Sequence, residues 1–330
     1  AEAAARMTFE QAADACLAQR RSGFNSASHE ATWWAPLPLH VLPTLGGRPV
    51  ASIGIGDVVA VLEPIWLDKH RTATLVRGRI EAVLNWAISN EKRPGPNPAE
   101  WNDNLRHRLP AVSKAMRESD ARPAVPVNDI ARWYAACTAA PWPAARALQA
   151  VALTATRSIE ARGMRWAELG GDVWTVPADR MKMREIHRVP ISEPLLQLIE
   201  AQRKAVYDGP YRGSPLVFPS ATGRELADLA VSDVMKKLHA ADVAAGGGGW
   251  LDPASNAPAV PHGLRATFRI WAQEQRVDRD VAELALAHRE RNAVVRAYAR
   301  DDLLGLRRPV MAAWAGLLTG TTPVSTVGPE

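Results

Sequence analysis

The stretch PHGLRATFRIWAQEQ, residues 261–275, determines how the second half of the chain is organised. It follows a glycine-rich segment, residues 244–261, that we interpret as a long flexible loop. Apolar residues then recur at helical spacing, which predicts a helix over residues 264–275. His262 and Arg265 stand one turn apart where this helix begins. Taken alone, the pair indicates only the start of a helix.

Two further candidate residues lie downstream of this helix. His288 and Tyr298 are ten residues apart, among helices predicted over residues 280–287, 293–299 and 302–317. A buried histidine and a packed tyrosine are the ordinary interpretation of such positions. Neither residue predicts chemistry by itself.

Upstream, Arg157 and Glu160 lie in LTATRSIEARGMRW, residues 153–166. We predict a helical stretch over residues 144–169, where this pair would be a surface ion pair worth a few tenths of a kcal/mol. Two β-rich segments, residues 173–177 and 187–191, flank the basic turn RMKMRE at residues 180–185. They predict a β-hairpin whose turn carries Lys182.

The order of these residues changes their interpretation. Together they resemble the tyrosine recombinase family, and specifically the integrases of bacterial mobile elements and P4-like prophages; the matching positions, in order, are Arg157 with Glu160, Lys182, His262, Arg265, His288 and Tyr298. Flanking phrases match as well: VRGRIEAVLNWA, WTVPADRMKM, MKMREIHRVPIS and HRERNAVVRAYARDDLLGLRRPVMAAWA. The resemblance extends from about residue 7 to residue 318.

The chain departs from the family pattern at small residues. Ala155 stands where the family often has glycine, Thr156 follows it, and Ala287 precedes His288 where glycine is common. None of these differences replaces a functional group. They therefore bear on backbone geometry alone.

The resemblance implies a nucleophile and two phosphate-binding residues. Tyr298 would attack a DNA phosphate and form a 3′-phosphotyrosyl linkage, which stores the bond energy for rejoining. Arg157 and Arg265 would bind the non-bridging oxygens, because a guanidinium pairs with phosphate through two N–H groups and stays charged. Glu160 would orient one of these arginines.

The resemblance also implies how protons are handled. Lys182 is the expected general acid for the leaving 5′-oxygen, and nearby arginines would lower the pKa of its ammonium group. His262 would handle a proton near Tyr298, and His288 would donate a hydrogen bond to a non-bridging oxygen. The sequence has no Asp/Glu cluster of the two-metal nuclease kind, so we expect neither metal nor cofactor.

The fold that we expect is mainly α, with a small antiparallel β-sheet in the catalytic domain, and forms a two-domain clamp on DNA. The predicted parts are a helical core-binding (SAM-like) DNA-binding domain over residues 1–108, a proline-containing linker over 109–123, a tyrosine recombinase catalytic domain over 124–318, and a disordered tail over 319–330. Arm-binding domains precede these parts in the subgroup, and the chain has no initiator Met, so we expect a piece of a longer protein.

Helices predicted in the first domain are an amphipathic one over residues 7–20, with Thr8 as N-cap, and a longer one over residues 72–89. Asp57 is expected to cap a short helix over residues 58–62, and prolines interrupt residues 36–49. On the long helix, Leu75 is assigned to the apolar stripe. Arg77 and Arg79 are the best candidates for phosphate contact, with solvated surface arginines as an equal alternative.

Composition bounds the class of protein. Lys+Arg 40 against Asp+Glu 35 gives a net charge of +5, a mild basic excess that is compatible with a polyanionic partner. Two cysteines about 120 residues apart suit a reducing compartment and exclude a CxxC zinc site. The chain has no apolar run of the about 18–20 residues that span a bilayer and no signal peptide. We therefore expect a cytoplasmic, nucleoid-associated bacterial protein.

The expected partners follow from the resemblance: double-stranded DNA attachment sites, a homotetramer on DNA with a monomer possible without it, and accessory DNA-bending or excisionase proteins. The apolar side of residues 302–317 would dock on a neighbouring protomer or pack within its own domain. Three alternatives remain at this point: a type IB topoisomerase-like enzyme, a catalytically silent DNA-binding regulator, and a metal-dependent nuclease. The integrase-like first domain, the intact set of six catalytic positions and the missing carboxylate cluster argue against them in that order.

Overall fold

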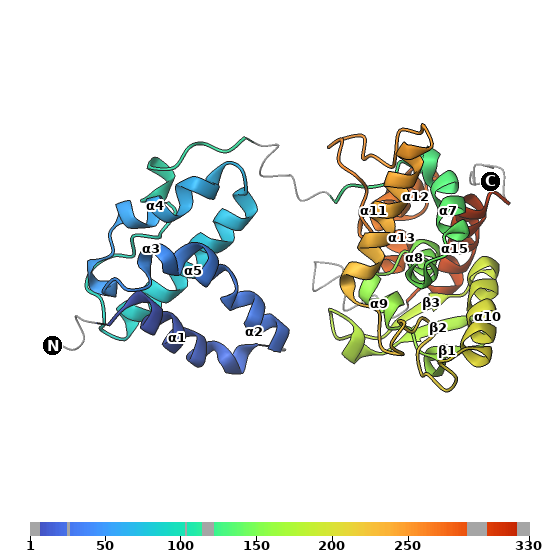
Figure 1. The fold of residues 1–330 in the computed structure, drawn as a ribbon, viewed down its shortest axis with the longest axis horizontal. Helices are drawn as coiled ribbons and strands as arrows, with labels where there is room; N and C mark the ends of the chain where they lie inside the picture. The colour runs from blue at the N-terminus through green and yellow to red at the C-terminus, as the bar shows by residue number, and fades with distance from the viewer. Residues whose placement is uncertain (1–6, 25–26, 103, 114–121, 289–301, 322–330) are drawn as a thin grey trace. The chain divides into compact units, whose positions relative to one another are not determined.

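A computed structural model of the chain describes residues 7–24, 27–102, 104–113, 122–288 and 302–321. These residues belong to two compact units, Ala1–Asp120 and Ala121–Glu330 (Figure 1). Each unit has its own buried apolar cluster. Tyr298 and the helix predicted over residues 293–299 lie outside the described residues, as does most of the predicted tail.

Helices build the first unit. Its elements are α1 (Phe9–Arg20), η2 (Arg21–Gly23), α2 (Ala27–Trp34), η3 (Leu37–Val41), α3 (Leu42–Leu45), η4 (Val50–Ser52), α4 (Ile55–Trp66), α5 (His70–Ser89) and η5 (Leu105–His107). Thr8 caps α1 as predicted: its hydroxyl accepts from the Gln11 N–H at 3.3 Å, and the Gln11 side chain accepts from the Thr8 N–H at 3.0 Å. The prolines near residue 40 occupy first-turn positions of η3 and α3, where no helical hydrogen bond is lost, so helical turns form there despite them.

Two predictions for the first unit need correction. Helix α4 begins after Gly54, not at Asp57, and the Asp57 carboxylate instead accepts from the Gly54 N–H at 2.9 Å. On α5 the buried face runs through Val76, Ile80 and Leu84, whereas Leu75 is 38% exposed. A helix has 3.6 residues per turn, so one residue of error in phase is enough to move a side chain out of the core.

A three-stranded antiparallel sheet lies in the second unit, in the order β1-β2-β3. Its strands are β1 (Leu169–Gly170), β2 (Val173–Val176) and β3 (His187–Pro190), with Trp174 opposite Val189. The predicted hairpin is confirmed. Strand β1 was missed, because residues 144–169 were predicted to be helical throughout.

That helical prediction is wrong in its second half. Helix α8 (Pro143–Thr154) ends at Ala155, whose φ of 52° lies in the left-handed region. A second, short helix, α9 (Ser158–Arg162), then starts with Arg157 at its N-cap position. Arg157 therefore occupies a turn between two helices, not the face of one long helix.

The remaining helices surround α8, which contacts α7 (Ile130–Ala139), α10 (Glu193–Asp208), α11 (Asp228–Ala244), α12 (Gly263–Glu274) and α15 (Leu304–Thr319) (Figure 1). Helix α13 (Arg279–Ala285) packs on α12 and α15, while η6 (Val127–Asp129), η7 (Trp166–Glu168) and η8 (Ala178–Arg180) are short connections. The aromatic residues Phe268, Trp271 and Trp314 cluster in this core, with ring centroids 5.1–5.8 Å apart.

The apolar side of α15 packs inside its own unit. Leu304, Met311 and Trp314 are buried there, and the Trp314 indole donates to the Ala152 carbonyl at 2.7 Å. Of the two expectations for this segment, packing within the domain is therefore correct for these residues. Leu306 on the same helix is 58% exposed, so docking of that part on a neighbouring protomer stays a prediction.

The predicted linker, residues 109–123, is too long at both ends. Leu109 is buried in the first unit, and the Pro110 carbonyl accepts from the Trp66 indole at 2.9 Å. At the other end the Pro123 carbonyl accepts from the Val260 N–H at 3.0 Å, and Ala124 N–H donates to Asp252 at 3.0 Å. Residues 109–110 and 122–125 thus belong to the units that they contact.

The segment around residue 123 explains the glycine of the HGLR motif. A Cβ built on Gly263 would come within 1.9 Å of the Pro123 carbonyl oxygen, which no real contact allows. One turn later, the Thr267 hydroxyl donates to the Val125 carbonyl at 2.7 Å. Residues 123–125 therefore pack closely against the start of α12 and are hydrogen-bonded to it. Residues 244–261, predicted to be one flexible loop, also contain order: Leu251 and Pro258 form a β-bridge, and Trp250 is buried.

Candidate active site

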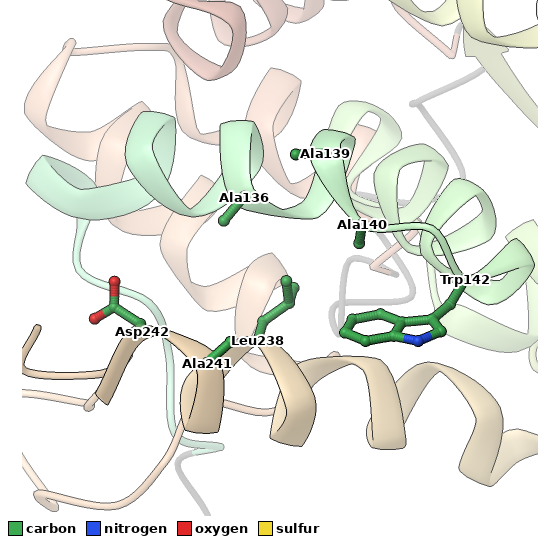
Figure 2. A pocket seen from close by; sticks show the side chains of 7 residues that line it. All are labelled: Ala136, Ala139, Ala140, Trp142, Leu238, Ala241 and Asp242. Atoms are coloured by element: carbon green, nitrogen blue, oxygen red, sulfur yellow. The ribbon is translucent and has the colours of Figure 1, made fainter. Parts of the chain in front are cut away.

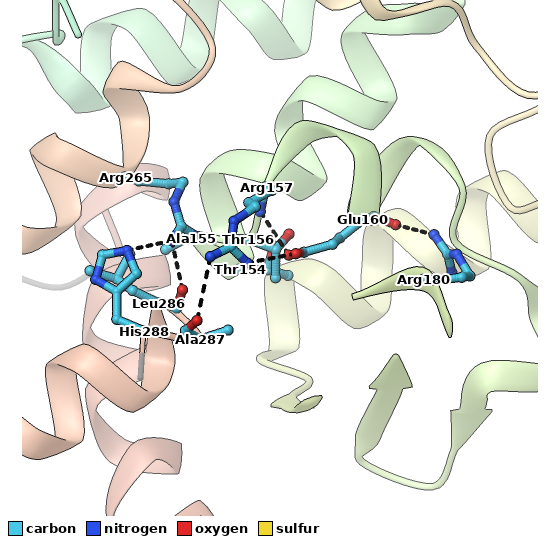
Figure 3. Close-up of polar contacts among 10 residues, drawn as sticks. All are labelled: Thr154, Ala155, Thr156, Arg157, Glu160, Arg180, Arg265, Leu286, Ala287 and His288. Carbon is cyan, nitrogen blue, oxygen red and sulfur yellow. Dashed lines mark hydrogen bonds and ion pairs between the residues drawn. The ribbon is translucent and has the colours of Figure 1, made fainter. Parts of the chain in front are cut away.

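Main-chain carbonyls hold the guanidinium group of Arg265. Its side chain projects from α12 and is 3% exposed; one terminal nitrogen donates to the Ala155 carbonyl and the other to the Leu286 carbonyl, both at 2.6 Å (Figure 3). The first carbonyl follows α8 and the second follows α13. Three segments that are far apart in the sequence thus meet at this one side chain.

Glu160 holds the second arginine. Its carboxylate accepts from the Arg157 main-chain N–H and from the Arg157 guanidinium, both at 2.9 Å, and a further guanidinium nitrogen lies 3.4 Å from the Ala287 carbonyl (Figure 3). Glu160 is 1% exposed. The pair is therefore a buried anchor, and its interpretation as a solvated surface ion pair is wrong. A buried ion pair offsets the cost of removing its charges from water only when its geometry is good and its remaining polar atoms are hydrogen-bonded.

Two of the three departures from the family pattern fall on strained backbone. Ala155 and Ala287 have φ values of 52° and 49°, a region that costs a residue with a Cβ about 1–2 kcal/mol. Their carbonyls are the ones that accept from Arg265 and Arg157. Glycine is common there in the family because these turns require left-handed backbone, and this chain makes the same turns with alanine.

His288 extends the cluster from Arg265. Its Nε2 lies 2.9 Å from a terminal nitrogen of Arg265, and its Nδ1 lies 2.7 Å from a carboxylate oxygen of Glu283. The other Glu283 oxygen accepts from Nε of Arg269 at 2.7 Å. Glu283 and Arg269 are not among the predicted site residues. They come from α13 and α12, and no sequence periodicity connects them to a histidine beyond the end of α13.

Burial and mutual charge shift the ionisation of the cluster. Burial lowers the pKa of Arg265 to about 10, with a further contribution from Arg157. Burial followed by the charge of Arg265 also lowers the pKa of His262. For His288, burial outweighs the Glu283 hydrogen bond, which acts to raise the pKa, and the net direction is downward. Burial acts to raise the pKa of Glu283, but the hydrogen bonds from His288 and Arg269 outweigh it and bring that pKa below its usual value.

His187 is a buried histidine at the edge of this cluster that the sequence analysis did not select. It lies on β3, is 7% exposed, and its Nε2 has no hydrogen-bond partner among the described residues. Burial lowers its pKa to about 3, with contributions from the charges of Arg307, Arg265 and Arg157. A hydrogen bond with the main chain of Ala285 acts in the opposite direction. The ring is therefore neutral and connects the hairpin to the end of α13.

A partly buried arginine, Arg180, links the hairpin to η7 through an ion pair and to α9 through a hydrogen bond. Arg180 pairs with Glu168 and donates to the Glu160 carbonyl at 2.6 Å (Figure 3), while Glu168 also accepts from the Trp174 indole at 2.9 Å. Lys182 follows two residues after Arg180 and is exposed in the β2–β3 connection. The structure therefore anchors the base of the turn that carries Lys182.

Arg157 is in direct contact with Glu160, and Arg265 with His288. The two arginines donate to the consecutive carbonyls of Leu286 and Ala287. His262, exposed at the start of α12, is close enough for its pKa to respond to Arg265, Arg157 and His288. Lys182 is exposed on the β2–β3 connection, and Tyr298 lies outside the described residues. The structure thus brings five of the predicted residues together, and their common role in one site stays a prediction, as do the places of Lys182 and Tyr298.

Comparison with known proteins identifies the family. The profile of the phage integrase central domain matches residues 9–104, and the profile of the phage integrase family matches residues 125–303, more than half of the chain. The chain belongs to the phage integrase family of tyrosine recombinases.

Two relatives of this integrase family member illustrate the extent of the match. Prophage integrase IntA of Escherichia coli K12 is 35% identical over 179 residues, which are 53% of this chain and 38% of IntA. Prophage integrase IntZ of the same organism is 26% identical over 313 residues, 93% of this chain and 70% of IntZ. The match to IntA thus spans well under half of that relative.

Solved integrase structures share the fold. A lambda integrase (75–356) dimer bound to a COC′ core site superimposes with a TM-score of 0.65 at 16% identity, covering 86% of this chain and 96% of that one. The Tn1549 transposon integrase (82–397) in complex with circular intermediate DNA gives a TM-score of 0.61 at 14% identity, covering 88% and 94%. At such identities the likeness shows the fold alone.

The predicted DNA contacts of this integrase family member lie in the first unit. Arg77 donates to Glu81 and to the Ala99 carbonyl, both at 2.9 Å. The Arg79 guanidinium lies 5.2 Å from the ring centroid of Trp33, and burial lowers its pKa. Both side chains are partly buried and have partners within the unit. Their contact with phosphate stays a prediction.

A hollow of about 320 Å³ lies elsewhere in the second unit, between α7 and α11 (Figure 2). Apolar side chains line it, among them Ala136, Trp142 and Leu238, with Asp242 at one edge. None of the predicted integrase site residues lines it.

Within the described residues, no helix is both long and apolar enough to cross a membrane.

Proposed function

We propose that this chain is a site-specific DNA recombinase, an integrase that cuts and rejoins duplex DNA through a covalent 3′-phosphotyrosyl bond at Tyr298. The observation that carries the proposal is the pair Arg157 and Arg265, fixed by main-chain carbonyls and Glu160 beside His288. Such a pair suits an anionic phosphate, and the family to which the chain belongs gives the reaction.

The arginines retain N–H groups for a phosphate. A guanidinium has five N–H donors. Among the described residues, three acceptors bind Arg265 and two bind the guanidinium of Arg157. Charge on the non-bridging oxygens grows as phosphorus becomes five-coordinate. Donors that are already fixed in place stabilise that charge without reorganising, which is the usual source of the largest catalytic effect.

The proposed reaction is a transesterification in two steps, in which each bond to phosphorus that forms is matched by one that breaks. The Tyr298 oxygen forms a bond to phosphorus while the bond from phosphorus to the 5′-oxygen breaks, so no hydrolysis occurs. His262 accepts the phenolic proton, and Lys182 gives a proton to the departing 5′-oxygen. In the second step a 5′-hydroxyl attacks the phosphotyrosine, and the same groups act in reverse.

The proposed partners are double-stranded attachment sites and, on DNA, other copies of the chain. One structural neighbour is a lambda integrase tetramer bound to a Holliday junction, and the sequence relatives are prophage integrases. We therefore propose a tetrameric recombination complex that integrates or excises a mobile element in the bacterial cytoplasm. The first unit would act as a core-binding domain and the second as the catalytic domain. Accessory DNA-bending or excisionase proteins would set the direction.

The test is trapping of the covalent intermediate. Duplexes taken from the junctions of the element that carries the gene, nicked beside the cleavage site, are incubated with the protein in EDTA. A protein–DNA adduct should form with the wild-type chain and be absent with Tyr298→Phe. An adduct that persists in Tyr298→Phe refutes the assignment of the nucleophile, and relaxation of supercoils by single bound monomers would favour a topoisomerase instead.

A further inference from the structure

The two ring nitrogens of His288 have opposite roles in the structure. A carboxylate can only accept, so the hydrogen between Nδ1 and Glu283 belongs to the ring. A guanidinium can only donate, so the Nε2 facing Arg265 presents its lone pair. Without DNA, His288 is thus a neutral imidazole that carries its hydrogen on Nδ1.

This tautomer cannot perform the role proposed for His288. To donate a hydrogen bond to a phosphate oxygen through Nε2, the ring must carry a hydrogen there as well. Because Nδ1 is committed to Glu283, the donating form is the imidazolium. The free site is therefore one proton short of the form that would bind phosphate.

We propose that Glu283 is a positioning residue that lets His288 take up one proton from solvent when a phosphate occupies the arginine pair. This inference rests on the proposed function. When phosphate is bound, the Nδ1–H still donates to the Glu283 carboxylate. The new Nε2–H donates to a non-bridging oxygen of the phosphate, in place of the hydrogen bond that Nε2 accepts from Arg265. The ring gains one proton and loses its hydrogen bond with Arg265, and no covalent bond to a heavy atom forms or breaks.

The surrounding charges support this coupling. The groups near His288 are the guanidinium groups of Arg265 and Arg157 and the imidazole of His262. Both arginines act to lower the pKa of His288, and Glu283 acts to raise it. A phosphate diester brings a negative charge that offsets the arginines. The carboxylate of Glu283 then remains as the partner of the imidazolium.

Arg269 fixes the orientation of the Glu283 carboxylate and helps to keep it ionised. Its Nε holds one carboxylate oxygen at 2.7 Å, and the ion pair joins α12 to α13, so the other oxygen is directed at His288. The hydrogen bonds to Glu283 also lower its pKa, which keeps the carboxylate ionised. His288, which follows the end of α13, thereby acquires a fixed orientation relative to Arg265 on α12.

The test uses the full chain and sulfate, an anion of similar shape to phosphate that does not titrate near neutral pH. Imidazole ¹⁵N NMR is recorded on Glu283→Gln and on the matched control Glu274→Gln, which removes the same charge from an exposed position at the end of α12. Sodium sulfate is compared with sodium chloride at equal ionic strength.

In the wild-type chain and in Glu274→Gln, the Nδ1–H tautomer should convert to imidazolium as sulfate is added. In Glu283→Gln the ring should remain neutral as sulfate is added, with its hydrogen still on Nδ1 because Arg265 continues to donate to Nε2. Glu283→Asp should restore part of the response. If His288 in Glu283→Gln takes up the proton as the wild-type chain does, the proposal is wrong.

A second readout separates this inference from the proposed function. With trapping substrates, cleavage should decrease as pH rises and the imidazolium loses its proton. The pH at which it falls to half of its maximum should be lower by one unit or more in Glu283→Gln than in the wild-type chain. A purely structural defect would instead lower the rate equally at every pH. A normal proton uptake without any covalent adduct would refute the proposed function and leave the inference intact. An adduct with an unchanged pH profile in Glu283→Gln would refute the inference and leave the function.

Discussion

Acid should destabilise the second unit through His187, the buried neutral histidine on β3. In the folded chain its pKa is about 3, lowered chiefly by burial. In the unfolded chain the pKa returns to about 6.5. The unfolded state therefore binds the proton first as pH falls. The stability that the neutral ring contributes is complete above about pH 6.5 and is lost progressively as pH falls toward the folded value.

The size of the effect follows from these two pKa values. Each unit of pH below the unfolded value costs about 1.4 kcal/mol until the folded value is reached. Between pH 7 and pH 5 the loss from His187 alone is about 2 kcal/mol. His262 and His288, whose pKa values are also lowered, act in the same direction. The contribution of His187 must therefore be isolated by substitution.

His187→Gln removes the titrating ring and retains an amide that can donate to the main chain of Ala285. Urea titrations at several pH values, followed by pulsed hydrogen exchange on peptides that contain β2 and β3, report the free energy of unfolding of the second unit. The loss between pH 7 and pH 5 should be about 2 kcal/mol smaller in His187→Gln than in the wild type. The control His107→Gln removes an exposed imidazole and should leave the pH dependence unchanged. Equal pH dependence in His187→Gln and wild type would show that the ring is not held neutral by burial.

Three further predictions concern packing and DNA contact. Gly263→Ala should destabilise the second unit by about 1–3 kcal/mol or more in urea titrations, because its Cβ would overlap the Pro123 carbonyl; a neutral result would mean that residues 122–125 are not held on α12. Ala287→Gly should raise the free energy of unfolding by about 1 kcal/mol, since it relieves a φ of 49° at a partly buried position; a loss of stability would contradict the backbone strain. Arg77→Gln and Arg79→Gln should each lower the slope of log K against log salt by about one unit for binding of duplex DNA, measured by fluorescence anisotropy. An unchanged slope would assign that arginine to internal packing alone.

Local pattern predicted most elements correctly where one face of a helix or strand is buried. Thr8 as the N-cap of α1, the long helix that ends at Ser89 and the hairpin around Lys182 follow from short-range chemistry that the chain carries in consecutive residues. The errors occur where distant contacts decide. Ala155 has good helix propensity, yet its left-handed turn ends α8, because its carbonyl is bound by an arginine 110 residues away. Strand β1 was missed for a different reason: it has two residues, too few for an alternating pattern to show, although its partner β2 follows within a few residues.

The sequence by itself determined the family resemblance and the candidate residues, because the order Arg157, Lys182, His262, Arg265, His288 and Tyr298 is written in the chain and needs no coordinates. Only the tertiary structure decided how the described ones are held. The carbonyls of Ala155 and Leu286, the carboxylate of Glu283 and the neutral ring of His187 come from separate elements and carry no common spacing. Side chains specify a reaction through their type and order, but the positions of main-chain acceptors and the local dielectric exist only once the chain has folded.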